Sequence, residues 1–202
     1  MEIIQILNSL ITLIISNMEE NKKKEEYRKL RLLVTTLCPN KCPLCCNNSW
    51  DFSKLPVVNR WNYDEIMFTG GEPLLFPDKV ATLAKSIKTI AKEEGNNPKL
   101  YIYTAVCDTI KVTSVIQYVD GIVLTPHNLS DIPKFIDLNN FMKHSNSFNG
   151  KSMRLNLFSN IKETLPIDID LSMWHIKDME WIKDCPVPKG EDFRRVSELW
   201  SE

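Results

Sequence analysis

The sequence predicts an α/β fold: a partial, open (β/α)6 barrel with parallel strands, plus an N-terminal helix. From Leu30 onward, short β-branched runs alternate with helical or loop stretches, the pattern of parallel β-α-β units joined by right-handed crossovers. Six such units are too few for a closed eight-stranded barrel, so an open one is expected. A chain of 202 residues, 43% hydrophobic and 25% charged, has room for one domain with one sizeable core.

Residues 1–29 precede the barrel and are expected to form an apolar helix followed by a charged linker. Met1–Asn17 is rich in isoleucine and leucine, but it is short for a bilayer span and is not followed by a signal-peptide cleavage site. We expect its apolar face to pack on the domain, with a partner or a membrane surface as the alternative. No transmembrane span is expected, and residues 30–202 form the core domain.

The first half of the barrel begins with a strand over Arg31–Leu37, an apolar, β-branched run. No long helix is expected over Asn47–Tyr63, because a proline interrupts this stretch and it lacks a helical period. The second strand is expected over Glu65–Thr69. A helix should then run from Pro77 to Glu94, where apolar residues recur at helical spacing and a glycine follows.

The second half continues the alternation. Asp108 and Ser130 are expected to cap two further helices. The remaining expected elements are strands at Lys99–Val106, Gly121–Thr125, Ser152–Phe158 and, roughly, Ile167–Trp174, and helices ending at Val119, spanning Asp131–His144, and spanning Glu191–Trp200.

Several chemically active residues follow the expected strands directly. In parallel α/β folds, ligands bind at the carboxyl ends of the strands. We therefore expect one face of the molecule to gather the loop Cys38–Cys45, the turn Gly70–Glu72, Cys107, His127 and Asn160.

The loop after the first strand holds Cys38, Cys42 and Cys45 in the spacing C-x3-C-x2-C. Such a dense group suits a metal site better than a disulfide framework. Three thiolates can hold an iron–sulfur cube and leave one iron free for another ligand. Zinc is the alternative, with His127 or His175 as a distant fourth ligand. Cys46 offers another register, and we prefer Cys45.

A second motif, Gly70-Gly71-Glu72-Pro73, follows the second strand. Two glycines allow the backbone to approach a ligand closely, and Glu72 offers a carboxylate to a ligand ammonium group. By itself this segment is an ordinary turn.

Together, the two motifs resemble those of the radical S-adenosyl-L-methionine (SAM) superfamily, over about Arg31–Asn160. The resemblance implies a [4Fe-4S] cluster held by Cys38, Cys42 and Cys45. It implies that Gly70, Gly71 and Glu72 receive the amino group of SAM. One-electron reduction, by a donor such as flavodoxin or ferredoxin, would cleave SAM to methionine and a 5′-deoxyadenosyl radical that abstracts hydrogen from a substrate.

Other site residues are suggested by the same resemblance. Asn156 and Asn160 occupy the fifth-strand segment that holds the ribose and carboxylate of SAM in relatives, although Asn160 also suits a strand-end turn. Thr125 and His127 are candidates to meet the ribose or the substrate. Cys107 is a candidate hydrogen donor, with a buried thiol as the simpler interpretation.

The substrate is not readable from the sequence. Small members of the superfamily include activases that act on a partner enzyme and 7-carboxy-7-deazaguanine synthases, and neither has a diagnostic motif here. A non-enzymatic iron–sulfur or zinc-binding module is the alternative from another class. A net charge of −1 gives no indication of nucleic-acid binding. Free thiols and an exposed cluster persist in a reducing compartment, so we expect a cytoplasmic protein.

Overall fold

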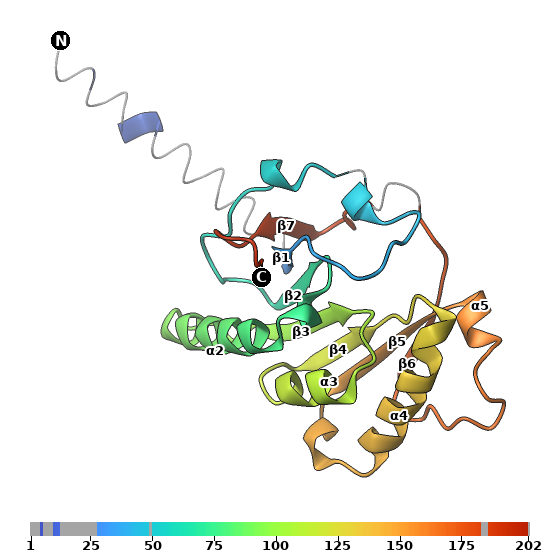
Figure 1. Ribbon diagram of the computed structural model, residues 1–202. Helices are drawn as coiled ribbons and strands as arrows, with labels where there is room; N and C mark the ends of the chain where they lie inside the picture. The colour runs from blue at the N-terminus through green and yellow to red at the C-terminus, as the bar shows by residue number, and fades with distance from the viewer. Residues whose placement is uncertain (1–4, 6–9, 13–27, 49, 183–185, 202) are drawn as a thin grey trace.

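The computed structural model describes residues 5, 10–12, 28–48, 50–182 and 186–201. Its centre is a seven-stranded sheet in the order β6-β5-β4-β3-β2-β1-β7 (Figure 1). The strands are β1 (Lys29–Thr35), β2 (Glu65–Gly70), β3 (Lys99–Thr104), β4 (Gly121–Leu124), β5 (Ser152–Phe158), β6 (His175–Met179) and β7 (Glu191–Arg195). The α-helices are α2 (Pro77–Glu93), α3 (Thr109–Ile116), α4 (Ile132–Lys143) and α5 (Ser159–Lys162).

Every strand pair in the sheet is parallel. Strands β6 and β7 are the two edges and do not pair with each other, so the sheet does not close. The predicted partial, open barrel is therefore confirmed. Because all strands run in one direction, their carboxyl ends lie along a single edge of the sheet.

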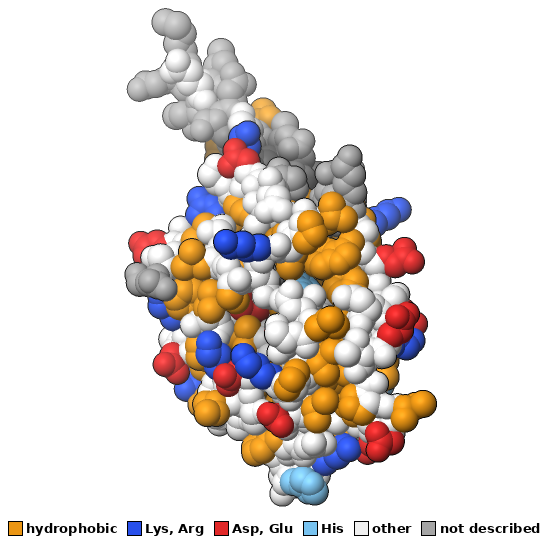
Figure 2. Space-filling view, turned by 45° about the vertical axis from the view of Figure 1, so that its right-hand side comes forward, with side chains coloured by type: hydrophobic (Ala, Val, Ile, Leu, Met, Phe, Trp, Pro, Cys, Tyr) orange, Lys and Arg blue, Asp and Glu red, His pale blue; other side chains and the backbone are white. Residues whose placement is uncertain are grey.

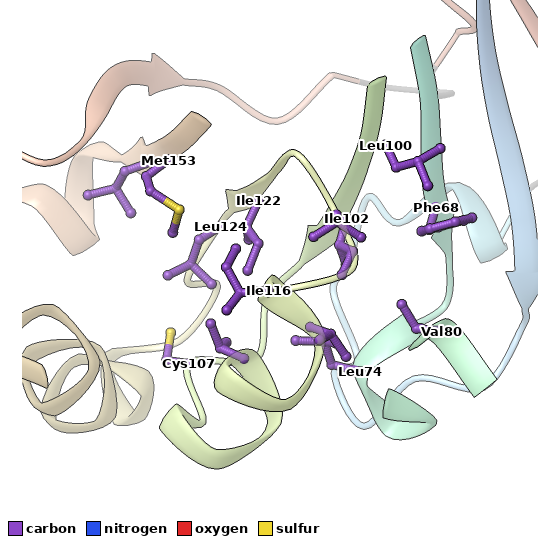
Figure 3. Close-up of a cluster of buried hydrophobic side chains, with 14 of the residues drawn as sticks. Phe68, Leu74, Val80, Leu100, Ile102, Cys107, Ile116, Ile122, Leu124 and Met153 are labelled. Carbon is purple, nitrogen blue, oxygen red and sulfur yellow. The ribbon is translucent and has the colours of Figure 1, made fainter. Parts of the chain in front are cut away.

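The main core lies between the sheet and helices α2, α3 and α4, which Figure 1 shows on one side of the sheet. Helix α2 buries Val80, Ala84, Ile87 and Ala91, one stripe of an amphipathic helix. These side chains meet alternate residues of the strands, such as Phe68 and Ile102 (Figure 3).

The opposite, concave face of the sheet is partly filled by the loop after the cysteines. As predicted, the described residues between 47 and 63 (all but 49) form no long helix, and their helical structure is limited to short 3₁₀ turns at Cys46–Asn48 and Phe52–Lys54. Trp50 and Phe52 pack on Phe193 of β7, with ring centroids 5.1 and 6.4 Å away. The loop therefore occupies the concave face beside β1 and β7.

The predicted C-terminal helix was wrong. Residues 191–195 form strand β7, not the start of a helix over Glu191–Trp200, and residues 196–201 have no regular structure. Pairing with β1 overrides the local helical pattern: Arg31 pairs with Glu191 at 2.8 Å, and the backbone N–H of Trp200 donates to the carbonyl of Val34 at 2.8 Å.

The predicted position of the sixth strand was also wrong. The strand is His175–Met179, and Ile167–Trp174 is irregular. The cause is the buried Asn139 of α4. Its amide donates to the carbonyl of Asp170 (3.1 Å) and accepts from the indole of Trp174 (2.9 Å), which fixes the segment as a loop against the helix.

The predicted helix caps gave mixed results. Asp108 caps α3, accepting from the backbone N–H of Lys111 at 3.0 Å, although α3 ends at Ile116 and not at Val119. The expected cap at Ser130 was wrong, because a 3₁₀ turn over Leu129–Asp131 precedes α4.

The predicted apolar helix and charged linker over residues 1–29 lie mostly outside the described residues. The described positions within the first seventeen, Gln5 and Leu10–Thr12, are helical. In the described part of the chain, we find no helix with the length and hydropathy that crossing a bilayer requires.

Candidate functional site

The cysteine loop surrounds a hollow of about 390 Å³ at the carboxyl edge of the sheet. Strand β1 delivers the loop, and a backbone hydrogen bond from Cys45 N–H to the Cys42 carbonyl (3.2 Å) tightens it. The three predicted ligands Cys38, Cys42 and Cys45 all line the hollow, are free thiols and are half-buried. The structure therefore places them together around one space.

The thiols influence one another electrostatically. Burial, followed by the charges of Cys45 and Cys38, raises the pKa of the Cys42 thiol to about 11. Burial also raises the pKa of Cys38. Three thiolates in this loop require a compensating cation, since each disfavours the ionisation of its neighbours. Among the described residues, no three His, Cys, Asp or Glu side chains converge as a site for a single metal ion.

His127 and two aromatic rings lie beside the cysteine loop. The Nδ1 atom of His127 is 3.2 Å from the Sγ atom of Cys42. Its ring contacts Phe158 at 5.8 Å and Trp181 at 5.3 Å between centroids, and those two rings stack at 4.4 Å. Burial lowers the pKa of His127, so the imidazole is neutral at neutral pH. The arrangement forms an aromatic wall, His127–Phe158–Trp181, next to Cys42.

Apolar side chains are also exposed in the cysteine loop, in the wall and directly after it in the chain. Leu44 is 42% exposed, Trp181 39% and Ile182 60%. Figure 2 shows a band of hydrophobic side chains on the side of the molecule that it presents, with charges of both signs around it.

The double glycine joins the second motif to the cysteine loop. A Cβ atom on Gly70 would lie 2.2 Å from the carbonyl oxygen of Thr35, and one on Gly71 would lie 2.0 Å from that of Leu37. The backbone N–H groups of Gly71 and Glu72 donate to these same oxygens, both at 2.7 Å. The glycines thus allow two backbone segments to touch, and this contact fixes the entry to the cysteine loop.

Glu72 is buried beneath that contact, with 1% of its surface exposed. Its Oε1 accepts from the hydroxyl of Thr104 (2.7 Å) and the N–H of Leu74 (2.9 Å), and its Oε2 accepts from the N–H of Ala105 (2.9 Å). Burial raises the pKa of Glu72, and the three hydrogen bonds oppose that rise. In this structure its carboxylate ties β2 to β3; its predicted contact with SAM stays a prediction.

The remaining candidates divide between the site and the core. Asn156 donates to the hydroxyl of Thr125 at 3.1 Å, so these two neighbours meet near the ends of β4 and β5. Asn160 is exposed on α5, and no contact joins its side chain to the others. Cys107 is 3% exposed and lies within the helix-side core (Figure 3). Burial raises its pKa, and its thiol donates to the carbonyl of Ala105 at 3.7 Å.

Two positions that the sequence did not point to also belong here. Phe158 is the last residue of β5 and completes the aromatic wall. Asn47 lines the hollow, donates to the carbonyl of Thr36 at 3.0 Å, and keeps a buried Oδ1 with no hydrogen-bond partner. That oxygen is available to a donor on a ligand. An asparagine pair after a cysteine triplet is a weak sequence signal, because asparagines are common in loops. His175, by contrast, is the first residue of β6, at the end of the strand away from the cysteines.

Comparison with solved structures gives distant likenesses alone. No protein-family model matches the chain, and no curated protein matches it. Among solved structures, Streptococcus suis SuiB bound to S-adenosylmethionine matches with a TM-score of 0.44 and 12% sequence identity. The match covers 93% of this chain and 52% of SuiB, so the chain spans about half the length of that protein. So distant a likeness does not say what this chain binds.

Proposed function

We propose that the chain is a radical SAM enzyme, with a [4Fe-4S] cluster on Cys38, Cys42 and Cys45 and with SAM as its cofactor. The observation that carries the proposal is the hollow at the carboxyl edge of the sheet, bordered by three free thiols and fixed in place by the Gly70–Glu72 turn. A cube binds each thiolate at a different iron, so its ligands need not converge on one point.

The chain's own residues fit such a group in three respects. The thiols are half-buried, and burial raises the pKa values of Cys38 and Cys42, so a cation would favour their thiolate forms. The aromatic wall shields one side of Cys42 from water. Asn47 Oδ1 offers a buried, unpaired acceptor in the same hollow, suited to the amino group of SAM.

When bound and reduced by an external one-electron donor of the flavodoxin or ferredoxin kind, the cluster supplies the electron that splits SAM into methionine and a 5′-deoxyadenosyl radical. The protein's contribution is positional. The backbone contact between Gly71 and Thr35 holds the turn against the cysteine loop, and Asn156 with Thr125 presents polar groups from the two neighbouring strands.

The test is anaerobic reconstitution of the full chain with iron and sulfide, followed by reduction and addition of SAM. We expect the absorbance and paramagnetic signal of a [4Fe-4S] cluster and the formation of 5′-deoxyadenosine. Alanine variants of Cys38, Cys42 and Cys45 should each lose both. The matched control is Cys46→Ala, which should keep iron and product.

Other outcomes would refute the proposal. Stoichiometric zinc in the purified protein with no 5′-deoxyadenosine would support the non-enzymatic zinc module. A stable cluster without SAM cleavage would support an electron-transfer module. If Cys46→Ala loses the cluster and Cys45→Ala keeps it, the third ligand is Cys46.

A further inference from the structure

The concave face of the sheet carries charged residues that the proposed cofactor site does not use. Residues of the strands alternate between the two faces, and one set packs on the helices. The other set includes Leu33, Met67, Tyr101 and Val123, which are buried and yet lie outside the helix-side core. These residues form an apolar floor on the concave face.

Two arginines lie above this floor, each over a tyrosine ring. Arg31 of β1 is 5.8 Å from the ring centre of Tyr103, and Arg154 of β5 is 4.6 Å from that of Tyr101. Such stacking orients a guanidinium group without consuming its hydrogen-bond donors.

The two arginines differ in their partners. Arg31 forms an ion pair with Glu191 of β7 at 2.8 Å, beside the aromatic rings that fill that half of the face. Arg154 donates only through Nε, to the hydroxyl of Ser152 at 3.2 Å. Among the described residues, no carboxylate pairs with Arg154, and its two Nη groups donate to none of them.

Strand β6 adds a histidine and a lysine beside Arg154. By register, His175 lies opposite Arg154 and Lys177 lies opposite Asn156, so both belong to the same face. Both are exposed, and in the described part of the chain neither is paired with a carboxylate. Asp178, the acidic neighbour, alternates to the other face and pairs with Lys162 at 2.7 Å.

We propose that Arg154, supported by Lys177, binds the carboxylate or phosphate group of a small organic substrate on the concave face beside β5 and β6. A guanidinium with both Nη groups free matches the paired oxygens of these anions.

The position of Arg154 on β5 sets its distance from the cysteine loop. It lies four residues before Phe158 on β5, which corresponds to about 13 Å of strand. Phe158 belongs to the aromatic wall beside Cys42. An anion bound at Arg154 would therefore extend its other end toward the cysteine loop. The assignment of this anion as the substrate rests on the proposed function.

The test measures binding of anions to the full chain, without turnover. Inorganic phosphate is titrated and followed by phosphorus NMR, and benzoate is titrated and followed by proton NMR, at constant ionic strength. Tighter binding of phosphate would indicate a phosphate ester, and tighter binding of benzoate a carboxylate. Arg154→Gln should weaken the binding of the preferred anion by about tenfold or more, which corresponds to the loss of one charge-assisted contact.

Two further variants keep the test independent of folding. Arg154→Lys retains the charge without the planar fork, and should give an intermediate affinity. The matched control is Arg31→Gln, which removes the stacked arginine that Glu191 already neutralises, and should change anion affinity less than about twofold. Unchanged binding in Arg154→Gln, or no binding of either anion by the wild type at tens of millimolar, would overturn the site.

SAM itself carries a carboxylate, so competition decides between the two ligands. If benzoate or phosphate displaces SAM, Arg154 serves the cofactor and the substrate site is refuted. Anion binding through Arg154 in a chain that makes no 5′-deoxyadenosine would refute the proposed function and leave the anion site standing. Cluster formation with SAM cleavage but no anion binding would remove only the anion site.

Discussion

The two segments that meet at the candidate site, the cysteine loop and the Gly70–Glu72 turn, are held in opposite ways. In the turn, Glu72 is almost completely buried and accepts three hydrogen bonds from the chain. In the loop, Cys38, Cys42 and Cys45 are half-buried, and the described contact of a thiol with another side chain is that of Cys42 with His127.

This difference separates residues that the fold needs from residues that it does not. The glycines and Glu72 are explained by packing alone, since they join β1, β2 and β3 at their carboxyl ends. Packing does not explain three cysteines around one hollow. The functional proposal therefore rests mainly on the thiols, and the turn contributes by holding their loop in place.

The sharpest way to break the turn is Gly71→Ala. The new Cβ would overlap the backbone oxygen of Leu37, which cannot rotate away as a side chain could. We expect a loss of about 3 kcal/mol or more in the free energy of unfolding, measured by denaturant titration of the metal-free protein.

The matched control for that overlap is Gly95→Ala. Gly95 has a positive φ of 75°, but no atom lies within 4 Å of its Cβ position, so only backbone strain remains, at about 1 kcal/mol. Equal losses in the two variants would show that the contact with Leu37 adds nothing to stability.

A smaller effect is expected from Glu72→Gln. The amide oxygen can replace one carboxylate oxygen, but the amide NH₂ then faces an N–H donor of Ala105 or Leu74. An unpaired buried donor and a lost hydrogen bond cost about 2–3 kcal/mol. The exposed Glu93→Gln, at the end of α2, should leave the unfolding midpoint unchanged. A midpoint for Glu72→Gln equal to that of the control would contradict the structural role of Glu72.

Asp120, a hydrogen-bonded carboxylate at the other end of the sheet, should contribute less to folding stability than Glu72, because it is partly exposed. Burial alone would raise the pKa of Asp120, but the N–H of Leu100 and the ammonium of Lys88 outweigh it and lower that pKa. Asp120→Asn should cost about 1 kcal/mol at neutral pH. Because the folded-state pKa of Asp120 lies below that of the unfolded chain, its stabilising effect is fully present above about pH 4. This stabilisation is lost as the pH falls through the folded-state pKa.

The pH series tests this sign directly. The difference in unfolding free energy between the wild type and Asp120→Asn should shrink as the pH falls below about 4. A difference that grows in acid would mean that Asp120 is destabilised, not stabilised, by its surroundings.

The sequence predicted the first five strands and helix α2 because their patterns are local: apolar runs end at glycines, prolines and capping residues. It mispredicted β7 because Glu191–Arg195 becomes a strand only through its pairing with β1, which is distant in the chain. The cysteine triplet was visible from its spacing. The sequence did not reveal the burial of Glu72 or the lack of a carboxylate partner for Arg154, because both depend on side chains from other strands.

The smallest expected effect on folding is also the most informative for the cysteine loop. Cys38→Ser replaces a half-buried thiol by a hydroxyl of similar size, and no described side chain bonds to that thiol. We expect the unfolding free energy of the metal-free protein to change by less than about 0.5 kcal/mol. Iron bound per chain after reconstitution should nevertheless fall to background, because a hydroxyl is a poor iron ligand. A large loss of stability would mean that Cys38 is part of the packing, and the contrast between loop and turn would fail. Full retention of iron would mean that iron binds without Cys38.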